Sequence, residues 1–73
     1  MFKANELKAE FISRGLTYKD MAKALGICEK AFYDKMNELS EWKYTELLSI
    51  KALIGKKKFD YIFFEWVLTN GSN

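Results

Sequence analysis

Residues 17–37, TYKDMAKALGICEKAFYDKMN, decide the fold of this chain, because their apolar side chains recur at helical spacing on both sides of Gly26. Gly26 supplies the positive φ that a tight turn needs, which glycine adopts without a steric penalty. Ile27 then fills the angle between the two segments. We therefore predict helices at 18–25 and 29–37. Their inward-facing residues are Met21, Ala22, Leu25, Phe32 and Met36.

Polar residues and glycines at the segment ends support this interpretation. Thr17 precedes the first of these helices as an N-cap, and Asp20 three residues later makes an acidic variant of the capping box. Asn5 and Thr45 are expected to cap two further helices. Left-handed C-terminal caps are expected at three glycines that follow helical segments, namely Gly15, Gly26 and Gly55.

Two helices joined by a tight turn form a helix-turn-helix, in which the second helix is free to enter the DNA major groove. Over about residues 5–64 the sequence resembles the phage-repressor class of these proteins (Cro/repressor-like, or Xre class). The matching positions are Leu16-Thr17, Met21-Ala22, Leu25-Gly26-Ile27 and Phe32, and the segments 32–37 and 62–64 are similar to small prophage proteins. The resemblance implies a sequence-specific, DNA-binding transcriptional regulator of phage or mobile-element origin.

Three more segments complete the predicted fold. Residues 6–14 are predicted as a helix with Leu7, Phe11 and Ile12 inward, and residues 46–54 as a helix with Leu47, Ile50, Leu53 and Ile54 inward. Residues 58–68 are the most apolar segment, and their aromatic and branched composition also suits a strand. We favour a helix, since the rest of the chain is helical and no pairing strand is evident. The prediction is a single all-α, five-helix domain over residues 1–73.

The composition argues against most enzyme and metal-site classes. The 73 residues include no histidine and one cysteine, and the net charge is +2. Ser-His-Asp and Cys-His catalysis therefore has no base, and a zinc or haem site held by protein ligands alone is not expected. No apolar run is long enough to cross a membrane, and the N-terminus lacks a secretion signal. We expect a cytoplasmic non-enzyme with no cofactor and, without a second domain, no small-molecule ligand.

The exposed positions of the 29–37 helix are the candidate base-reading residues: Glu29, Lys30, Tyr33 and Asp34. A lysine there serves both bases and phosphates, whereas carboxylates repel phosphates but accept a hydrogen bond from the cytosine N4 amine. If this helix enters the major groove, the residues near the DNA backbone are Thr17, Tyr18, Lys19, Lys35 and Asn37. Lys35 stands where the repressor pattern has an apolar residue, and Met36 is expected to take that packing role.

The same residues also have interpretations without DNA. Glu29 and Asp34 suit a solvated helix surface, Tyr18 suits a partly buried ring, and residues 56–58 (three lysines) suit a solvated loop after a helix. The near-neutral net charge, the acidic 29–37 helix and the aromatic C-terminal segment favour the alternative function. That alternative is a protein-interaction module derived from a helix-turn-helix, such as an antirepressor or adaptor, without DNA binding.

The 58–68 segment carries two apolar stripes on opposite faces if it is helical. One stripe, which we expect to face the core, contains Phe59, Ile62, Phe63 and Trp66. The other contains Tyr61, Phe64 and Leu68, and it would leave large apolar groups exposed in a monomer. We therefore expect a homodimer through the second stripe, alongside double-stranded DNA as the main partner.

Overall fold

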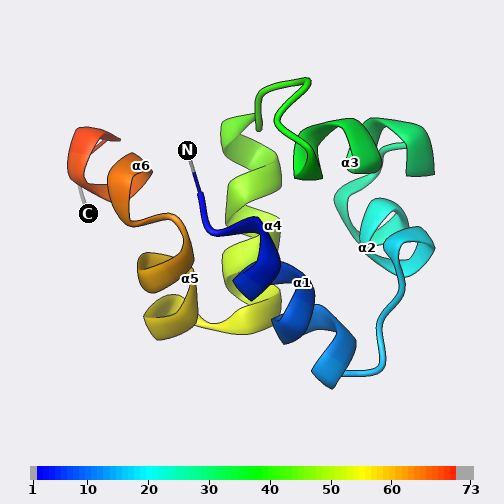
Figure 1. The fold of residues 1–73 in the computed structure, drawn as a ribbon, viewed down its shortest axis with the longest axis horizontal. Coiled ribbons are helices and arrows are strands. Elements are labelled where there is room, and N and C mark those ends of the chain that lie inside the picture. Colours follow the sequence, from blue (N-terminus) through cyan, green and yellow to red (C-terminus); the bar gives the residue numbers. More distant parts are fainter. Residues whose placement is uncertain (1, 71–73) are drawn as a thin grey trace.

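The computed structural model describes residues 2–70, and within that range every regular element is an α-helix. Six helices follow one another over these residues (Figure 1). Their bounds are α1 Ala4–Ser13, α2 Tyr18–Leu25, α3 Glu29–Met36, α4 Tyr44–Ile54, α5 Lys56–Ile62 and α6 Phe64–Asn70. The predicted all-α class is confirmed, with six helices in the place of five.

Helix α4 is the central element of the fold. Figure 1 shows α2 and α3 on one side of it, α5 and α6 on the other, and α1 across the middle. The core between these helices is lined mainly by aromatic and branched side chains, which the chain supplies from all of the first five helices. The buried apolar residues are Leu7, Phe11, Met21, Ala22, Phe32, Met36, Leu47, Ile50, Ile54, Phe59, Ile62 and Phe63.

The N-terminal cap of α2 and the turn between α2 and α3 have the predicted geometry. The Thr17 hydroxyl accepts a hydrogen bond from the Asp20 backbone N–H, and the Asp20 carboxylate accepts one from the Thr17 N–H, at 3.1 and 2.9 Å. Gly26 ends α2 in the left-handed conformation, with φ 74° and ψ 28°. The Ile27 N–H then donates to the Ala22 carbonyl at 3.0 Å, which satisfies a carbonyl at the end of α2.

Several predicted helix ends are wrong by one or two residues. Asn5 and Thr45 lie inside α1 and α4, whose N-caps are Lys3 and Lys43. The Lys43 N–H is satisfied by the Glu46 carboxylate at 2.8 Å, so the first turn of α4 is stabilised without a capping side chain at Thr45. The first helix ends at Ser13 rather than residue 14, and α3 ends at Met36.

One glycine prediction is confirmed at α1, and another glycine prediction and one core prediction need correction. Gly15 follows the C-cap residue Arg14 with a positive φ of 77°, and the next N–H, of Leu16, donates to the Phe11 carbonyl at 2.9 Å, as in a left-handed helix end. Gly55 has a positive φ of 90°, but its ψ of 156° lies outside the left-handed helical region. Ile12 is 53% exposed, because Leu7 and Phe11 are one turn apart and already define the buried face of α1.

The C-terminal segment is helical as predicted, but it is two helices rather than one. The break falls at Phe63, whose φ of −108° and ψ of 36° leave the helical range. The bend lets Phe63 enter the core, where its ring stacks on Phe2 and Phe59 at centroid distances of 5.1 and 4.8 Å. Residues 56–58, predicted as a loop, form the first turn of α5.

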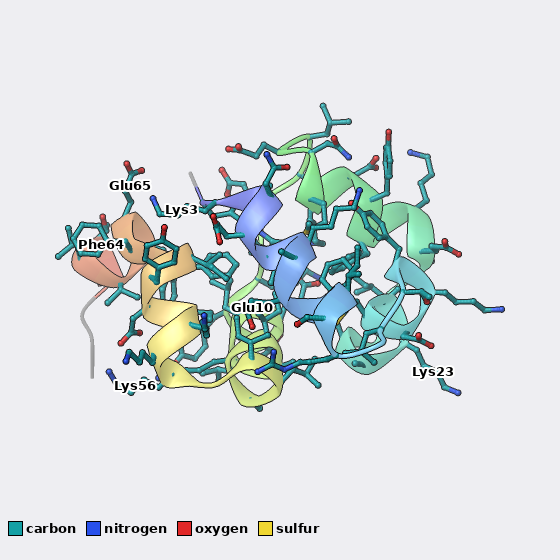
Figure 2. All side chains as sticks on the ribbon, turned by 60° about the horizontal axis from the view of Figure 1, so that its bottom comes forward. Lys3, Glu10, Lys23, Lys56, Phe64 and Glu65 are labelled. Atoms are coloured by element: carbon teal, nitrogen blue, oxygen red, sulfur yellow. The ribbon has the colours of Figure 1, made fainter. Side chains whose placement is uncertain are left out.

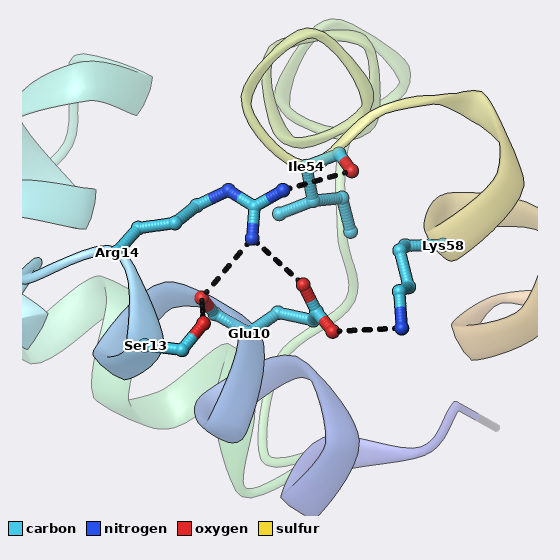
Figure 3. Close-up of polar contacts among 5 residues, drawn as sticks. All are labelled: Glu10, Ser13, Arg14, Ile54 and Lys58. Carbon is cyan, nitrogen blue, oxygen red and sulfur yellow. Dashed lines mark hydrogen bonds and ion pairs between the residues drawn. The ribbon is translucent and has the colours of Figure 1, made fainter.

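A polar cluster joins α1 to the far end of α4 and to α5 (Figure 3). The Glu10 carboxylate pairs with Arg14 at 2.7 Å and with Lys58 at 3.3 Å. Arg14 also donates to the Ile54 carbonyl at 3.4 Å, close to the C-terminus of α4. The cluster thus connects α1, α4 and α5.

Two carboxylates in these local networks make the stability depend on acid pH. Desolvation acts to raise the pKa of Glu10, but hydrogen bonds from Lys58 and Arg14 outweigh it and lower that pKa below its usual value. Hydrogen bonds from the Thr17 N–H and hydroxyl lower the pKa of Asp20. Since both pKa values are lower in the folded chain, this stabilisation is complete above the ordinary carboxyl pKa of about 4 and is lost as pH falls through the folded-state values.

We therefore expect the melting temperature to fall between about pH 5 and pH 2, with part of that fall due to these two groups. Circular dichroism melts across this range measure it. The E10Q/D20N variant should start lower at neutral pH and lose less on acidification. Parallel pH profiles for the variant and the parent would contradict the assignment.

Candidate nucleic-acid interface

The outer surface of α3 carries the predicted base-reading residues. Glu29, Lys30 and Tyr33 are exposed, and Asp34 is partly exposed. Lys30 and Asp34 are four residues apart and form an ion pair at 3.1 Å along this surface. All four predicted residues therefore lie on the accessible side of one helix, while Phe32 and Met36 fasten its other side to the core.

Helix α3 itself is short and weakly capped. Its eight residues extend about 12 Å, enough for its N-terminal half to meet a few base pairs. The N-cap is Cys28, whose side chain is exposed and makes no capping hydrogen bond. The orientation of α3 is therefore set by the Gly26 turn and by the core side chains rather than by its cap.

Tyr18 is positioned by aromatic packing at the start of α2. Its ring lies edge-on to Phe32 and Phe11 at centroid distances of 5.3 and 5.5 Å. The ring of Tyr33 lies 6.4 Å from it, and the Lys8 ammonium lies 5.8 Å from its centroid. The Tyr18 ring is thus partly buried, as the interpretation without DNA expects. Through its contact with Tyr33, it connects the start of α2 with the exposed side of α3.

Of the other residues that were predicted to contact the DNA backbone, three are exposed and one is buried. Thr17, Lys19 and Asn37 are exposed at the ends of α2 and α3. The Asn37 amide donates to the Tyr33 carbonyl at 2.8 Å, so it partly caps the C-terminus of α3. Lys23, which the sequence analysis did not single out, is a further exposed cation on α2 and projects into solvent (Figure 2).

Lys35 was predicted to contact the DNA backbone, but it is buried and does not lie on this surface. Only 6% of it is exposed. Its ammonium pairs with Glu46 of α4 at 3.0 Å and donates to the Glu41 carbonyl at 2.9 Å. A side chain held in this way cannot reach a phosphate without leaving a buried carboxylate unpaired.

The sequence carried one signal of this arrangement. The repressor pattern has an apolar residue where Lys35 stands, and the structure buries both Lys35 and Met36 there rather than Met36 alone. Glu46, the partner that makes the burial of Lys35 tolerable, was not identified from the sequence. Its position in the first turn of α4 also lets it accept the Lys43 N–H.

The three residues predicted at a dimer interface are exposed. Tyr61, Phe64 and Leu68 show 55%, 56% and 68% of their surface to solvent. The break at Phe63 assigns Tyr61 to α5 and the other two to α6, so they do not form one continuous helical stripe. Phe64 projects from α6 at the outer edge of the molecule, and the Lys3 ammonium lies 5.3 Å from the Tyr61 ring (Figure 2).

No protein-family model, curated protein or solved structure matches this chain. Among residues 2–70, no helix has the length and apolar character to cross a membrane. The same part of the chain contains no group of three or more Cys, Asp or Glu residues arranged to hold a metal ion.

Proposed function

We propose that this chain is a sequence-specific, double-stranded DNA-binding regulator of the phage-repressor type, acting in a bacterial or phage-infected cytoplasm. The observation that supports it best is the geometry of α2 and α3. A capping box starts α2, the left-handed Gly26 ends it, and α3 is fastened by Phe32 and Met36 so that its other face stays open. This is the arrangement in which a second helix enters the major groove.

In the proposed complex, the exposed side of α3 reads bases. Lys30 donates to guanine O6 and N7, and Glu29 accepts from a cytosine N4 amine. The Lys30–Asp34 pair exchanges for these contacts, at low cost since an exposed i,i+4 pair is worth under about 1 kcal/mol. The residues beside the DNA backbone are Thr17, Tyr18 and Lys19 at the start of α2, and Asn37. Lys35 does not contact DNA and instead connects α3 to α4 through its ion pair with Glu46.

We propose further that the chain acts as a homodimer through Tyr61, Phe64 and Leu68. Their exposure leaves large apolar groups open to solvent on α5 and α6, and two-fold repressors place their recognition helices one DNA turn apart. Sedimentation equilibrium tests the dimer. A clean monomer at high micromolar concentration would remove this part of the proposal.

Substituting Lys30 tests the base-reading role. Lys30→Ala should weaken binding to the preferred duplex by about 1–3 kcal/mol and relax the preference at one base position. The preferred duplex comes from selection on a random library, and fluorescence anisotropy measures affinity at several salt concentrations. Lys57→Ala removes an exposed lysine from α5, on the other side of α4, and is the matched control that should leave affinity unchanged.

Glu29→Gln gives a second, independent readout. In a DNA reader it should change the preferred base at one position while leaving the melting temperature near that of the parent. If Lys30→Ala and Lys57→Ala reduce the affinity for the preferred duplex equally, binding depends on the overall positive charge rather than on contacts made by α3.

The alternative function is a protein-interaction module that keeps the helix-turn-helix but does not bind DNA. The acidic Glu29 and Asp34 on α3 favour it, because they oppose phosphates. Duplex binding by the unsubstituted chain distinguishes the two functions. Salt-dependent duplex binding at low ionic strength supports the DNA reader, and its absence overturns it.

A further inference from the structure

The buried ion pair between Lys35 and Glu46 is part of a larger polar network between α3 and α4. The Lys35 ammonium pairs with the Glu46 carboxylate at 3.0 Å and donates to the Glu41 carbonyl at 2.9 Å. Oε1 of the same carboxylate accepts the Lys43 N–H at 2.8 Å. This Lys35 network therefore joins the last turn of α3, two points of the connection that follows it, and the first turn of α4.

The connection at residues 37–43 has few other contacts that would fix its position. Trp42 is partly buried, and the other six residues of the connection are exposed. A segment with few buried apolar contacts opens locally at a low cost in free energy. The Lys35 network thus lies where the fold otherwise supplies little packing to hold the C-terminal end of α3.

An ion pair of this kind fixes geometry in a way that apolar packing does not. Apolar contacts have no preferred direction, so an apolar pair at positions 35 and 46 would stabilise several similar orientations of α3. A buried lysine and glutamate are stabilised only where their charged atoms meet, since a displacement leaves each charge unpaired in the interior. The Lys35 network therefore favours one rotation of α3 about its own axis.

The same rotation determines where the exposed side of α3 points. Lys30 and Tyr33 belong to the same short helix as Lys35, and their side chains are exposed where that of Lys35 is buried. A binding site needs its side chains held to within about 0.5 Å. We propose that the Lys35 network is a positioning device, which fixes the orientation of α3 against α4 and with it the register in which α3 meets base edges. The orientation is a property of the fold, whereas its effect on base recognition rests on the proposed DNA-binding function.

The K35M/E46L variant removes the network while keeping the core filled. We expect the backbone amides that follow α3 to exchange with solvent about tenfold faster than in the parent, because the connection opens more often. The probes are the N–H groups of Asn37, Glu38 and Leu39, which donate to backbone carbonyls of α3. Those carbonyls are present in the variant, so faster exchange reports opening rather than a lost acceptor.

Amide exchange is measured by NMR on the full chain. The reference amides are those of Met21 in α2 and Phe59 in α5, which correct for any change in global stability. The matched control variant is K56A/D60A, which removes an exposed ion pair of α5. It should leave the exchange of the probe amides as in the parent.

Duplex binding gives a second readout. K35M/E46L should keep the salt dependence of the parent, since it removes no cation from the exposed side of α3. The ratio of its affinities for the preferred duplex and for a duplex with one altered base pair should fall several-fold. K56A/D60A should keep the ratio of the parent.

The positioning role is overturned if the probe amides exchange at the parent's rate relative to the reference amides, if K56A/D60A gives the same increase, or if K35M/E46L does not fold. Faster exchange with an unchanged affinity ratio overturns the role in base recognition. A parent chain that binds no duplex overturns the proposed DNA function, and amide exchange then still decides whether the network positions α3.

Discussion

Replacing Glu46 with alanine should destabilise the protein by about 3–5 kcal/mol, because the substitution leaves the Lys35 ammonium buried without its counter-ion. Lys35 and Glu46 are 6% and 4% exposed, and their charged atoms are 3.0 Å apart. The same substitution removes the acceptor of the Lys43 N–H at the start of α4. In a domain with a total stability of roughly 5–10 kcal/mol, the loss should be visible as a large drop in the urea midpoint.

A double variant distinguishes a buried charge pair from simple loss of packing. Lys35→Met with Glu46→Leu replaces both charges with apolar side chains of similar volume, and it should recover most of the stability lost in Glu46→Ala. Urea unfolding, followed by tryptophan fluorescence, measures both. If the double variant is as unstable as Glu46→Ala, or if Glu46→Ala unfolds at the parent midpoint, the pair does not have the assigned role.

Replacing Gly26 with valine should cost about 1–3 kcal/mol, because a β-branched residue is strained at the φ of 74° that ends α2. A Cβ added at Gly26 meets no atom within 4 Å. The cost is therefore one of backbone conformation rather than of a clash with neighbours. If the chain has the proposed function, the variant should also bind the preferred duplex more weakly, because this turn orients α3.

A series at Gly26 checks this cause. Asparagine tolerates the left-handed conformation better than alanine does, and alanine better than valine, so stability should decrease in the order Gly, Asn, Ala, Val. Thermal melts by circular dichroism give the order. A valine variant that melts with the parent would show that this turn is not held in the left-handed conformation in solution.

Much of the fold was predictable because its determinants are local. Helix α2 has the predicted bounds, since Thr17, Asp20 and Gly26 act through contacts within four residues of the chain. Residues 58–68 are helical as predicted except at Phe63, where the segment breaks into two helices. The base-reading candidates of α3 were predicted as exposed, because Phe32 and Met36, at helical spacing, define its buried side.

Other features were not predictable from neighbours in sequence. The Lys35 network brings two side chains, from α3 and α4, to a backbone carbonyl and a backbone N–H of the connection between these helices. No periodicity in the sequence indicates this arrangement. Which carboxylate meets a buried lysine depends on how whole helices pack around α4.

The sequence by itself determined the all-helical class, the α2–turn–α3 unit and the exposed side of α3, because caps, glycine and apolar spacing act over a single turn of helix. Only the tertiary structure decided that Lys35 is buried and that the last helix breaks at Phe63. Both outcomes depend on distant partners. A lysine is buried only where a carboxylate such as Glu46 meets it across the core, and Phe63 leaves the helical conformation to fill space between Phe2 and Phe59.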